Sequence, residues 1–196
     1  MDSSAFLAKL ETYHAGVSGN GTAVLQRVVV STQIMLKDRG HKGVACAKSP
    51  IDAIVRGEVV VRSDKAVVYV HADEKVGVKA ARTFLENTDH ASQSIICVSM
   101  GGPTSFTRKE CADSKRIQFL TIRFCCFPII RHSLVPKHTV VRDHSFDVTK
   151  LPKIMTSDAV VQYYDWPVGT VLKIERVFGG HEIQTYYRVV TAASLS

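Results

Sequence analysis

Residues 57–73 read GEVVVRSDKAVVYVHAD and decide the fold of the first part of the chain. Two valine-rich segments, Glu58–Arg62 and Ala66–His71, are separated by the short polar turn Ser63–Lys65, which predicts two strands joined by a tight turn. VGVKAARTFLEN at residues 76–87 has the apolar spacing of a helix. SIICVSM at residues 94–100 is a short apolar run of the buried-strand type.

The pattern continues after this run. A break at Gly101–Pro103 starts a further expected helix, and RIQFLTIRF at residues 116–124 is a further expected strand. Strands and helices that alternate in this order predict a layered α/β unit. The expected fold class is therefore α/β (α+β).

Two helices are expected before this unit. Residues 4–13 carry apolar side chains at helical spacing, and Gly16–Gly21 breaks the pattern. A second helix is expected from Thr22 to Arg39, and Gly40 ends it as a C-terminal cap would. Its apolar stripe consists of Leu25, Val28, Val29, Thr32, Met35 and Leu36.

The sequence pattern changes after Pro128, in the last third of the chain. We expect a domain boundary there, with one domain at 1–130 and a smaller one at 131–196. A short helix is expected to begin near Thr156–Asp158, and Pro167 and Gly169 form a turn. TVLKIERV and IQTYYRVV alternate around Gly179–Gly180 and predict a hairpin.

Composition sets broad limits on function. The chain has 196 residues, of which 45% are hydrophobic and 22% charged, which is typical of a globular protein. Its net charge of +7 favours acidic partners, nucleic acid among them, although the basic residues are spread out and a solvated surface explains most of them.

The cysteines disfavour both a disulfide framework and a zinc site. Their number is odd, two are adjacent, and no C-x-x-C pair occurs. The five cysteines are Cys46, Cys97, Cys111, Cys125 and Cys126.

The start of the chain lacks the pattern of a secretory signal, and no apolar run is long enough to cross a bilayer. We therefore expect the chain in the cytosol or nucleus.

An ordered series of short motifs occupies the last third. It consists of LVPKH at 134–138, LPKI at 151–154, a D-x-V at 158–160, Gly169 before VLKIER at 171–176, and YYRVV at 186–190. The series resembles the assembly domain of the fifth-subunit family of RNA polymerases, which comprises the archaeal H polypeptide and its counterpart shared by the eukaryotic nuclear polymerases. LKDRGHK at 36–42 and residues 68–86 and 94–110 resemble the jaw domain that only the eukaryotic members carry.

The chain departs from the family pattern at three places. Ala159 stands where the family usually has proline, and Val168 where it usually has a basic residue. Only Thr139–Lys150 separates the first two motifs, whereas the cellular proteins carry a longer insert. These departures indicate a divergent lineage, such as a copy encoded by a large DNA virus.

The resemblance implies a non-catalytic polymerase subunit whose second domain docks on the largest subunit. Pro136 and Pro152 would stiffen docking segments, while Arg176 and Arg188 can fork onto carboxylates. The alternative is that prolines and tyrosines such as Tyr187 only fill a small core. The expected partner-binding residues are Pro136, His138, Pro152, Asp158, Tyr163, Tyr164, Gly169, Lys173, Arg176, Tyr187 and Arg188.

The first domain would form part of the jaw where downstream duplex DNA enters. Its basic side chains would contact phosphates without reading sequence. The expected DNA-proximal residues are Lys37, Arg39, Lys42, Arg108 and Lys109. The magnesium chemistry would belong to the two largest subunits, so no cofactor, small-molecule substrate or membrane partner is expected. The chain would act in the nucleus, or in a cytoplasmic viral factory or virion if a virus encodes it.

Two other functions stay open from the residues alone. A metal-dependent nuclease would need Asp113, Lys115 and a second carboxylate in one cleft. A free-standing basic adaptor for RNA would fit the charge, although the first domain lacks aromatic residues clustered on a strand for base stacking.

Overall fold

The structure is a computed structural model, and it divides the chain into two compact units, Met1–Pro128 and Ile129–Ser196. This division lies next to the boundary expected at residue 130. No helix in the described part of the chain is both long and apolar enough to cross a membrane. The structure describes residues 2–13, 20–87, 93–114, 116–143, 145, 147–178 and 182–192.

The first unit is built on a five-stranded sheet in the order β1-β2-β3-β4-β5. The first two pairings are antiparallel, and β3, β4 and β5 are parallel. The β3 strand is buried at all five positions, so it carries a continuous apolar sequence rather than an alternating one. The strands are β1 (Ala45–Cys46), β2 (Val61–Arg62), β3 (Ala66–Val70), β4 (Ser94–Ser99) and β5 (Ile117–Thr121).

Two helices connect the parallel strands. Helix α4 (Val78–Glu86) follows β3, and α5 (Ser105–Glu110) follows β4. Right-handed crossovers in the strand order β3-β4-β5 place both helices on one face of the sheet. There, Phe84 of α4 packs in one cluster with residues such as Tyr69 and Cys97, and the Tyr69 and Phe84 rings stack 4.3 Å apart.

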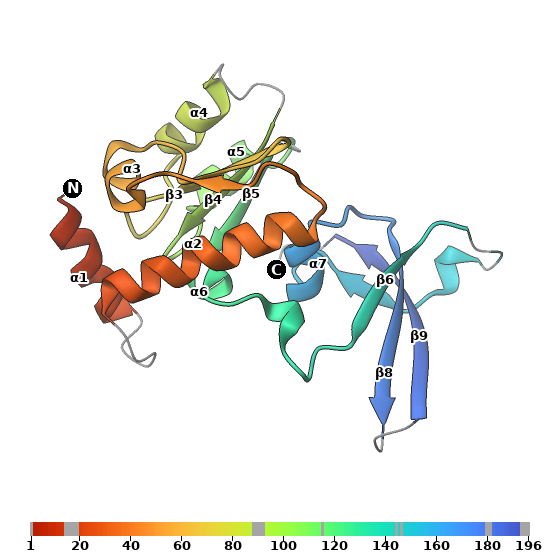
Figure 1. Ribbon diagram of the computed structural model, residues 1–196. Helices are drawn as coiled ribbons and strands as arrows, with labels where there is room; N and C mark the ends of the chain where they lie inside the picture. The colour runs from red at the N-terminus through yellow and green to blue at the C-terminus, as the bar shows by residue number, and fades with distance from the viewer. Residues whose placement is uncertain are drawn as a thin grey trace. The chain divides into compact units, whose positions relative to one another are not determined.

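Helix α2 (Gly21–Asp38) crosses the other face of this sheet (Figure 1). Asn20 caps its start by accepting a hydrogen bond from the Ala23 N–H, and Gly40, at a φ of +81°, follows its end. At Gly21, a Cβ atom would lie 2.2 Å from the carbonyl oxygen of Leu7, so only glycine permits the close approach to α1 (Ser3–Tyr13). Both expected N-terminal helices are confirmed.

Three of the five cysteines, Cys97, Cys111 and Cys125, are buried in this unit as small apolar side chains. All five lie among the described residues and carry free thiols. Burial raises the pKa of Cys97 and Cys125 to about 12, so both stay protonated at neutral pH. Cys97 is a buried structural thiol, because it lies in the same core cluster as Tyr69 and Phe84.

The second unit is a four-stranded sheet in the order β6-β8-β9-β7. Strands β6, β8 and β9 pair antiparallel, whereas β7 pairs parallel to β9. In Figure 1 the long strands β8 and β9 form a hairpin. The strands are β6 (Lys137–Val141), β7 (Lys153–Met155), β8 (Val171–Phe178) and β9 (Glu182–Thr191).

One short helix supports the core of the second unit. Helix α7 (Ala159–Tyr164) contributes Val161, which packs with Leu172 and Val190 of the sheet and with Trp166. Two 3-10 turns, η2 (Ile129–Arg131) and η3 (Val148–Lys150), lie before and after β6. The expected short helix and hairpin are confirmed, while the Gly179–Gly180 turn lies outside the described residues.

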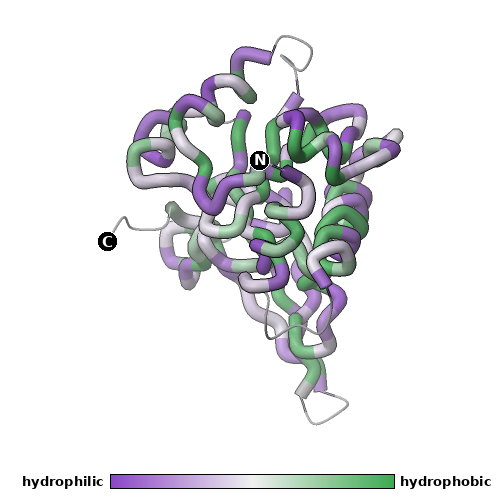
Figure 2. Tube along the Cα trace, turned by 90° about the vertical axis from the view of Figure 1, so that its left-hand side faces the viewer, coloured by the Kyte–Doolittle hydropathy of each residue, from purple (hydrophilic) through white to green (hydrophobic). Residues whose placement is uncertain are grey.

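Several short elements were not expected. These are β1, β6, β7, helix α3 (Pro50–Arg56) and helix α6 (Ile122–Cys125). The strand expected at residues 116–124 was wrong beyond Thr121, because α6 begins there, and β2 is shorter than expected. The α/β fold class is confirmed. Figure 2 shows that the hairpin of β8 and β9 carries both apolar and polar residues.

Candidate protein-interaction surface

The hairpin of β8 and β9 extends beyond its two neighbouring strands. The two strands pair from Val171↔Val189 to Phe178↔Glu182. In contrast, β6 reaches only Glu175 of β8, and β7 begins only at Val189 of β9. The outer part of the hairpin is therefore a two-stranded ribbon, which cannot bury either of its faces by itself.

One face of this ribbon carries exposed apolar side chains. Val177 and Ile183 are directly opposite each other in the register and are 61% and 63% exposed. Tyr187 lies on the same face, four residues from Ile183, and is 36% exposed. Lys173 and Glu175 complete this set of five, which we call the hairpin face. Leu172 and Ile174 point to the opposite side, into the core.

The charged members of the hairpin face are paired within the unit. The Lys173 Nζ donates to the Glu175 carboxylate at 2.7 Å, and the Lys137 Nζ lies 3.5 Å from the other oxygen. The hydrogen bond from Lys173 lowers the pKa of Glu175 and raises the pKa of Lys173 itself. The structure thus gives Lys173, an expected partner-binding residue, a role inside the sheet.

Three other expected partner-binding residues shape the fold locally. The Asp158 carboxylate accepts hydrogen bonds from the N–H groups of Val160 and Val161 at the start of α7. Tyr163 is only 2% exposed and belongs to the core. Gly169 has a φ of +90°, which the third position of a type II turn requires. These residues are structural in the isolated chain.

His138 and Tyr164 lie around the single tryptophan. The His138 Nδ1 donates to the Pro136 carbonyl oxygen at 2.7 Å, since a carbonyl can only accept. The His138 ring lies 6.5 Å from that of Trp166, which Tyr164 stacks upon at 4.5 Å. Burial lowers the pKa of His138, and the bond to Pro136 opposes that shift. The structure thus gives His138, an expected partner-binding residue, a hydrogen bond to the backbone of its own unit.

The remaining expected residues are exposed and lie on or beside the hairpin. Arg176 and Arg188 are exposed on β8 and β9, and Pro152 is exposed directly before β7. The Arg188 Nη1 donates to the Lys153 carbonyl oxygen at 3.2 Å. Val177 and Ile183 were missed by the sequence reasoning. Their signal was an apolar residue on each side of the glycine turn, at positions that alternate with polar residues.

Comparison with known proteins identifies the second unit. The family model described as RNA polymerase Rpb5, C-terminal domain, matches residues 127–190. The DNA-directed RNA polymerase subunit Rpo5 of Methanosphaera stadtmanae is 37% identical over 71 residues, which cover 92% of that protein and 32% of this chain. The chain belongs to the Rpb5 family. By family it is a subunit of a DNA-directed RNA polymerase, and the resemblance seen in the motif series is confirmed.

The basic residues expected near DNA fall into two groups on this Rpb5-family chain. Lys37 and Lys42 are exposed at and after the end of α2, on one side of the first sheet. Arg108 and Lys109 are exposed in the last turn of α5, on the other side. Arg39 is half-buried and donates to the Gln118 Oε1 at 2.8 Å, which ties α2 to β5. The five residues do not form one patch.

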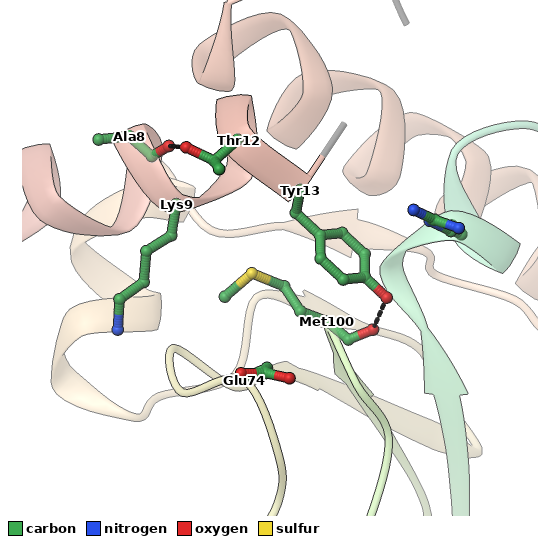
Figure 3. A pocket seen from close by; sticks show the side chains of 7 residues that line it. Ala8, Lys9, Thr12, Tyr13, Glu74 and Met100 are labelled. Carbon is green, nitrogen blue, oxygen red and sulfur yellow. Dashed lines mark hydrogen bonds between the residues drawn. The ribbon is translucent and has the colours of Figure 1, made fainter. Parts of the chain in front are cut away.

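A cavity of about 590 Å³ lies in the first unit beside α1 (Figure 3). The Tyr13 hydroxyl donates to the Met100 carbonyl oxygen, and the Arg123 guanidinium lies 4.9 Å from the centre of the Tyr13 ring. Lys9 and Glu74 also line it, so its charges are mixed. None of the residues expected to bind DNA or a partner subunit lines this cavity.

The nuclease hypothesis gains no geometric support in the part of the chain that the structure describes. There, no three histidine, cysteine, aspartate or glutamate side chains come together as metal ligands. Asp113 lies in the turn after α5 rather than at the end of a strand, and Lys115 lies outside the described residues.

Proposed function

We propose that the chain is a non-catalytic subunit of its polymerase, and that the second unit docks on the largest subunit through the hairpin face and through Arg188, which points to the opposite face of β9. The observation that carries this proposal is the family match to residues 127–190, which are nearly all of the second unit. The exposed members of the motif series lie on the same hairpin or beside it.

The chemistry of this surface supports docking to a protein. Val177, Ile183 and Tyr187 offer apolar and aromatic area that a partner can remove from water. Arg188 has five N–H donors, of which one is used on the Lys153 carbonyl, and no described carboxylate pairs with it. A carboxylate of the partner can therefore receive a forked pair of hydrogen bonds from Arg188.

The first unit lies beside the downstream duplex in this proposal. Lys37 and Lys42 on one side, or Arg108 and Lys109 on the other, contact phosphates. The chain then acts where its polymerase acts, in the nucleus, or in a cytoplasmic viral factory or virion if a virus encodes it. The resemblance of residues 36–42, 68–86 and 94–110 to the eukaryotic jaw domain supports this part.

The docking proposal is tested by purifying the tagged chain from cells that also produce the other polymerase subunits. The double variant Tyr187→Ala, Arg188→Glu removes the aromatic area and reverses the charge. We expect the largest subunit in near-equal amounts with the wild type and at least about tenfold less with the variant, the loss that about 1.4 kcal/mol produces. Arg142→Glu, the same charge reversal just after the edge strand β6, is the matched control and should bind as wild type.

Two checks make the result decisive. Trp166 is the single tryptophan and lies in the second unit, so its emission shows whether each variant is folded there. Recovery of the wild-type chain alone, or with nucleic acid only, contradicts the docking proposal. A metal-dependent DNA cleavage assay then tests the nuclease alternative.

The DNA contact is tested on the assembled polymerase. Affinity for downstream duplex is measured against salt for Lys37→Glu, Lys42→Glu and for Arg108→Glu, Lys109→Glu. The pair that faces DNA should lower the slope of log affinity against log salt by about one for each phosphate interaction that the substitutions remove. The other pair is the control, and unchanged slopes for both pairs contradict the proposed DNA contact.

A further inference from the structure

The backbone of β9 has one edge that its own sheet leaves open. The Val190 N–H donates to the Thr170 carbonyl on the β8 side, while the Val189 N–H donates to the Pro152 carbonyl on the β7 side. Backbone groups in a strand alternate between its two neighbours. Ile183 and Thr185, which lie six and four residues before Val189, therefore direct their N–H and C=O groups to the β7 side.

No strand of the described chain occupies that side at these positions. The pairing of β7 with β9 covers only Val189–Thr191. No hydrogen bond joins the backbone groups of Ile183 or Thr185 to another described residue. On the opposite side of the hairpin, β6 pairs with β8 as far as Glu175, so only a short end of β8 is left there. The open edge of β9 is the longer one.

This edge lacks the devices that usually protect edge strands. Natural edges carry lysines, prolines or bulges that discourage pairing with another chain. Residues 183–187 read IQTYY, without a charge or a proline, and all five are exposed. Such a segment has the β-branched and aromatic composition that pairs readily with another strand. An unprotected edge of this kind indicates that another polypeptide segment covers it in the assembled polymerase.

We propose that the open edge of β9 binds an extended segment of another polymerase subunit, which adds a strand to the sheet of the second unit. The proposed strand addition rests on the proposed docking function and specifies the kind of contact by which docking occurs. The segment is extended and carries apolar residues at alternate positions, which meet Ile183 and the rest of the hairpin face. Arg188 points to the opposite face of β9 and pairs there with a carboxylate of the same segment.

Thr185→Pro tests the pairing by removing one outward N–H donor. Proline is tolerated at an edge position whose N–H faces solvent, because the β8–β9 hydrogen bonds do not use that donor. Thr185→Val is the matched control, since it keeps the N–H and the branched shape. In co-purification from cells that produce all subunits, we expect at least about tenfold less polymerase with Thr185→Pro and wild-type recovery with Thr185→Val.

Amide exchange gives a second measurement that does not depend on a variant. In the free chain, the N–H groups of Ile183 and Thr185 should exchange quickly, while those of Gln184 and Tyr186, which point to β8, exchange more slowly. In the assembled polymerase all four should be slow. Hydrogen–deuterium exchange with residue-resolved mass spectrometry of the full chain distinguishes these patterns, and it decides the question if Thr185→Pro fails to fold.

The outcomes separate this inference from the docking proposal. Normal recovery of polymerase with Thr185→Pro, together with fast exchange at Ile183 and Thr185 in the complex, overturns strand addition and leaves docking in place. Failure of the wild-type chain to bring polymerase subunits along contradicts docking itself. A dimer of the free chain that Thr185→Pro abolishes while polymerase recovery stays normal assigns the edge to a second copy and also overturns the proposal.

Discussion

The strands of the two sheets differ in how far their side chains are buried. In the first unit, β3 is buried at all five positions and β4 at five of six. In the second unit, β9 is buried only at Val189 and Val190 and is otherwise exposed or half-buried along its ten residues. The first sheet has helices over both faces, whereas the outer hairpin of the second has none.

This difference implies that the buried strands of the first sheet stabilise the fold, whereas the exposed hairpin of the second sheet is available for binding. Each apolar side chain buried in the first sheet contributes to folding of the free chain, at roughly 25 cal/mol per Å². Val177, Ile183 and Tyr187 of the hairpin face keep much of their surface in water, so their contribution to folding is small and their apolar area is left for a partner. The comparison predicts that equal truncations in the two units have unequal effects on stability, and that only the truncation on the hairpin face weakens assembly.

The largest expected effect comes from truncating one isoleucine in each sheet. Ile96→Ala in β4, where the side chain is 1% exposed, should lower the free energy of unfolding by about 2–5 kcal/mol. Ile183→Ala on the hairpin face should change it by less than about 0.5 kcal/mol, because the side chain is already exposed. Urea unfolding followed by circular dichroism measures both.

Assembly should show the reverse order. Ile183→Ala should reduce recovery of polymerase subunits, whereas Ile96→Ala, tested at a temperature where it is folded, should not. Equal losses of stability for the two truncations would break the comparison, since the hairpin would then be part of a core.

The sequence predicted the long elements because their periodicity is local. The β3 and β4 runs, the amphipathic α2 and the alternating hairpin each extend over several residues. The short elements depend on what they pair with: β1 and β7 have two and three residues and exist only through their partner strands. The error after β5 has a local cause, because the Thr121 hydroxyl accepts a hydrogen bond from the Phe124 N–H and starts α6.

The candidate site was predicted as a series of motifs, and not as a surface. Motif order identified the family, and the expected helix start near Thr156–Asp158 agrees with the cap that Asp158 forms, but neither gave a sign that Tyr163 is buried. The burial of Tyr163 depends on how α7 packs on the sheet. The open edge of β9 follows from the short length of β7, which no pattern within 182–191 contains.

A smaller effect tests the structural role given to Asp158. Asp158→Ala removes the cap of α7 and should destabilise the second unit by about 1 kcal/mol. Asp158→Asn keeps an oxygen acceptor at the same place and should cost much less, although it removes the charge. Urea unfolding followed by Trp166 emission reports the second unit, and equal losses for both variants would show that the charge rather than the cap matters.

The smallest expected effect is a pH dependence of the stability of the second unit, which arises from His138. Burial lowers the pKa of His138 in the folded chain below its ordinary value near 6.5, so the unfolded chain binds the proton more tightly. The contribution of His138 to stability is therefore fully present above pH 6.5 and falls as the pH drops through the folded pKa. His41 and His71 of the first unit are shifted in the same direction, also by burial, so a probe confined to the second unit is needed.

Trp166 supplies that probe, because its ring lies 6.5 Å from the His138 ring. Between about pH 7 and about pH 5, the unfolding midpoint in urea that Trp166 reports should fall more steeply for the wild type than for His138→Gln, which cannot titrate in this range. The emission of the folded wild type should also change with the protonation of His138 and give its pKa directly. Identical slopes for the two proteins would mean that the histidine is as solvated in the folded second unit as in the unfolded chain. The region around Trp166 would then resemble the open hairpin rather than the closed core of the first unit.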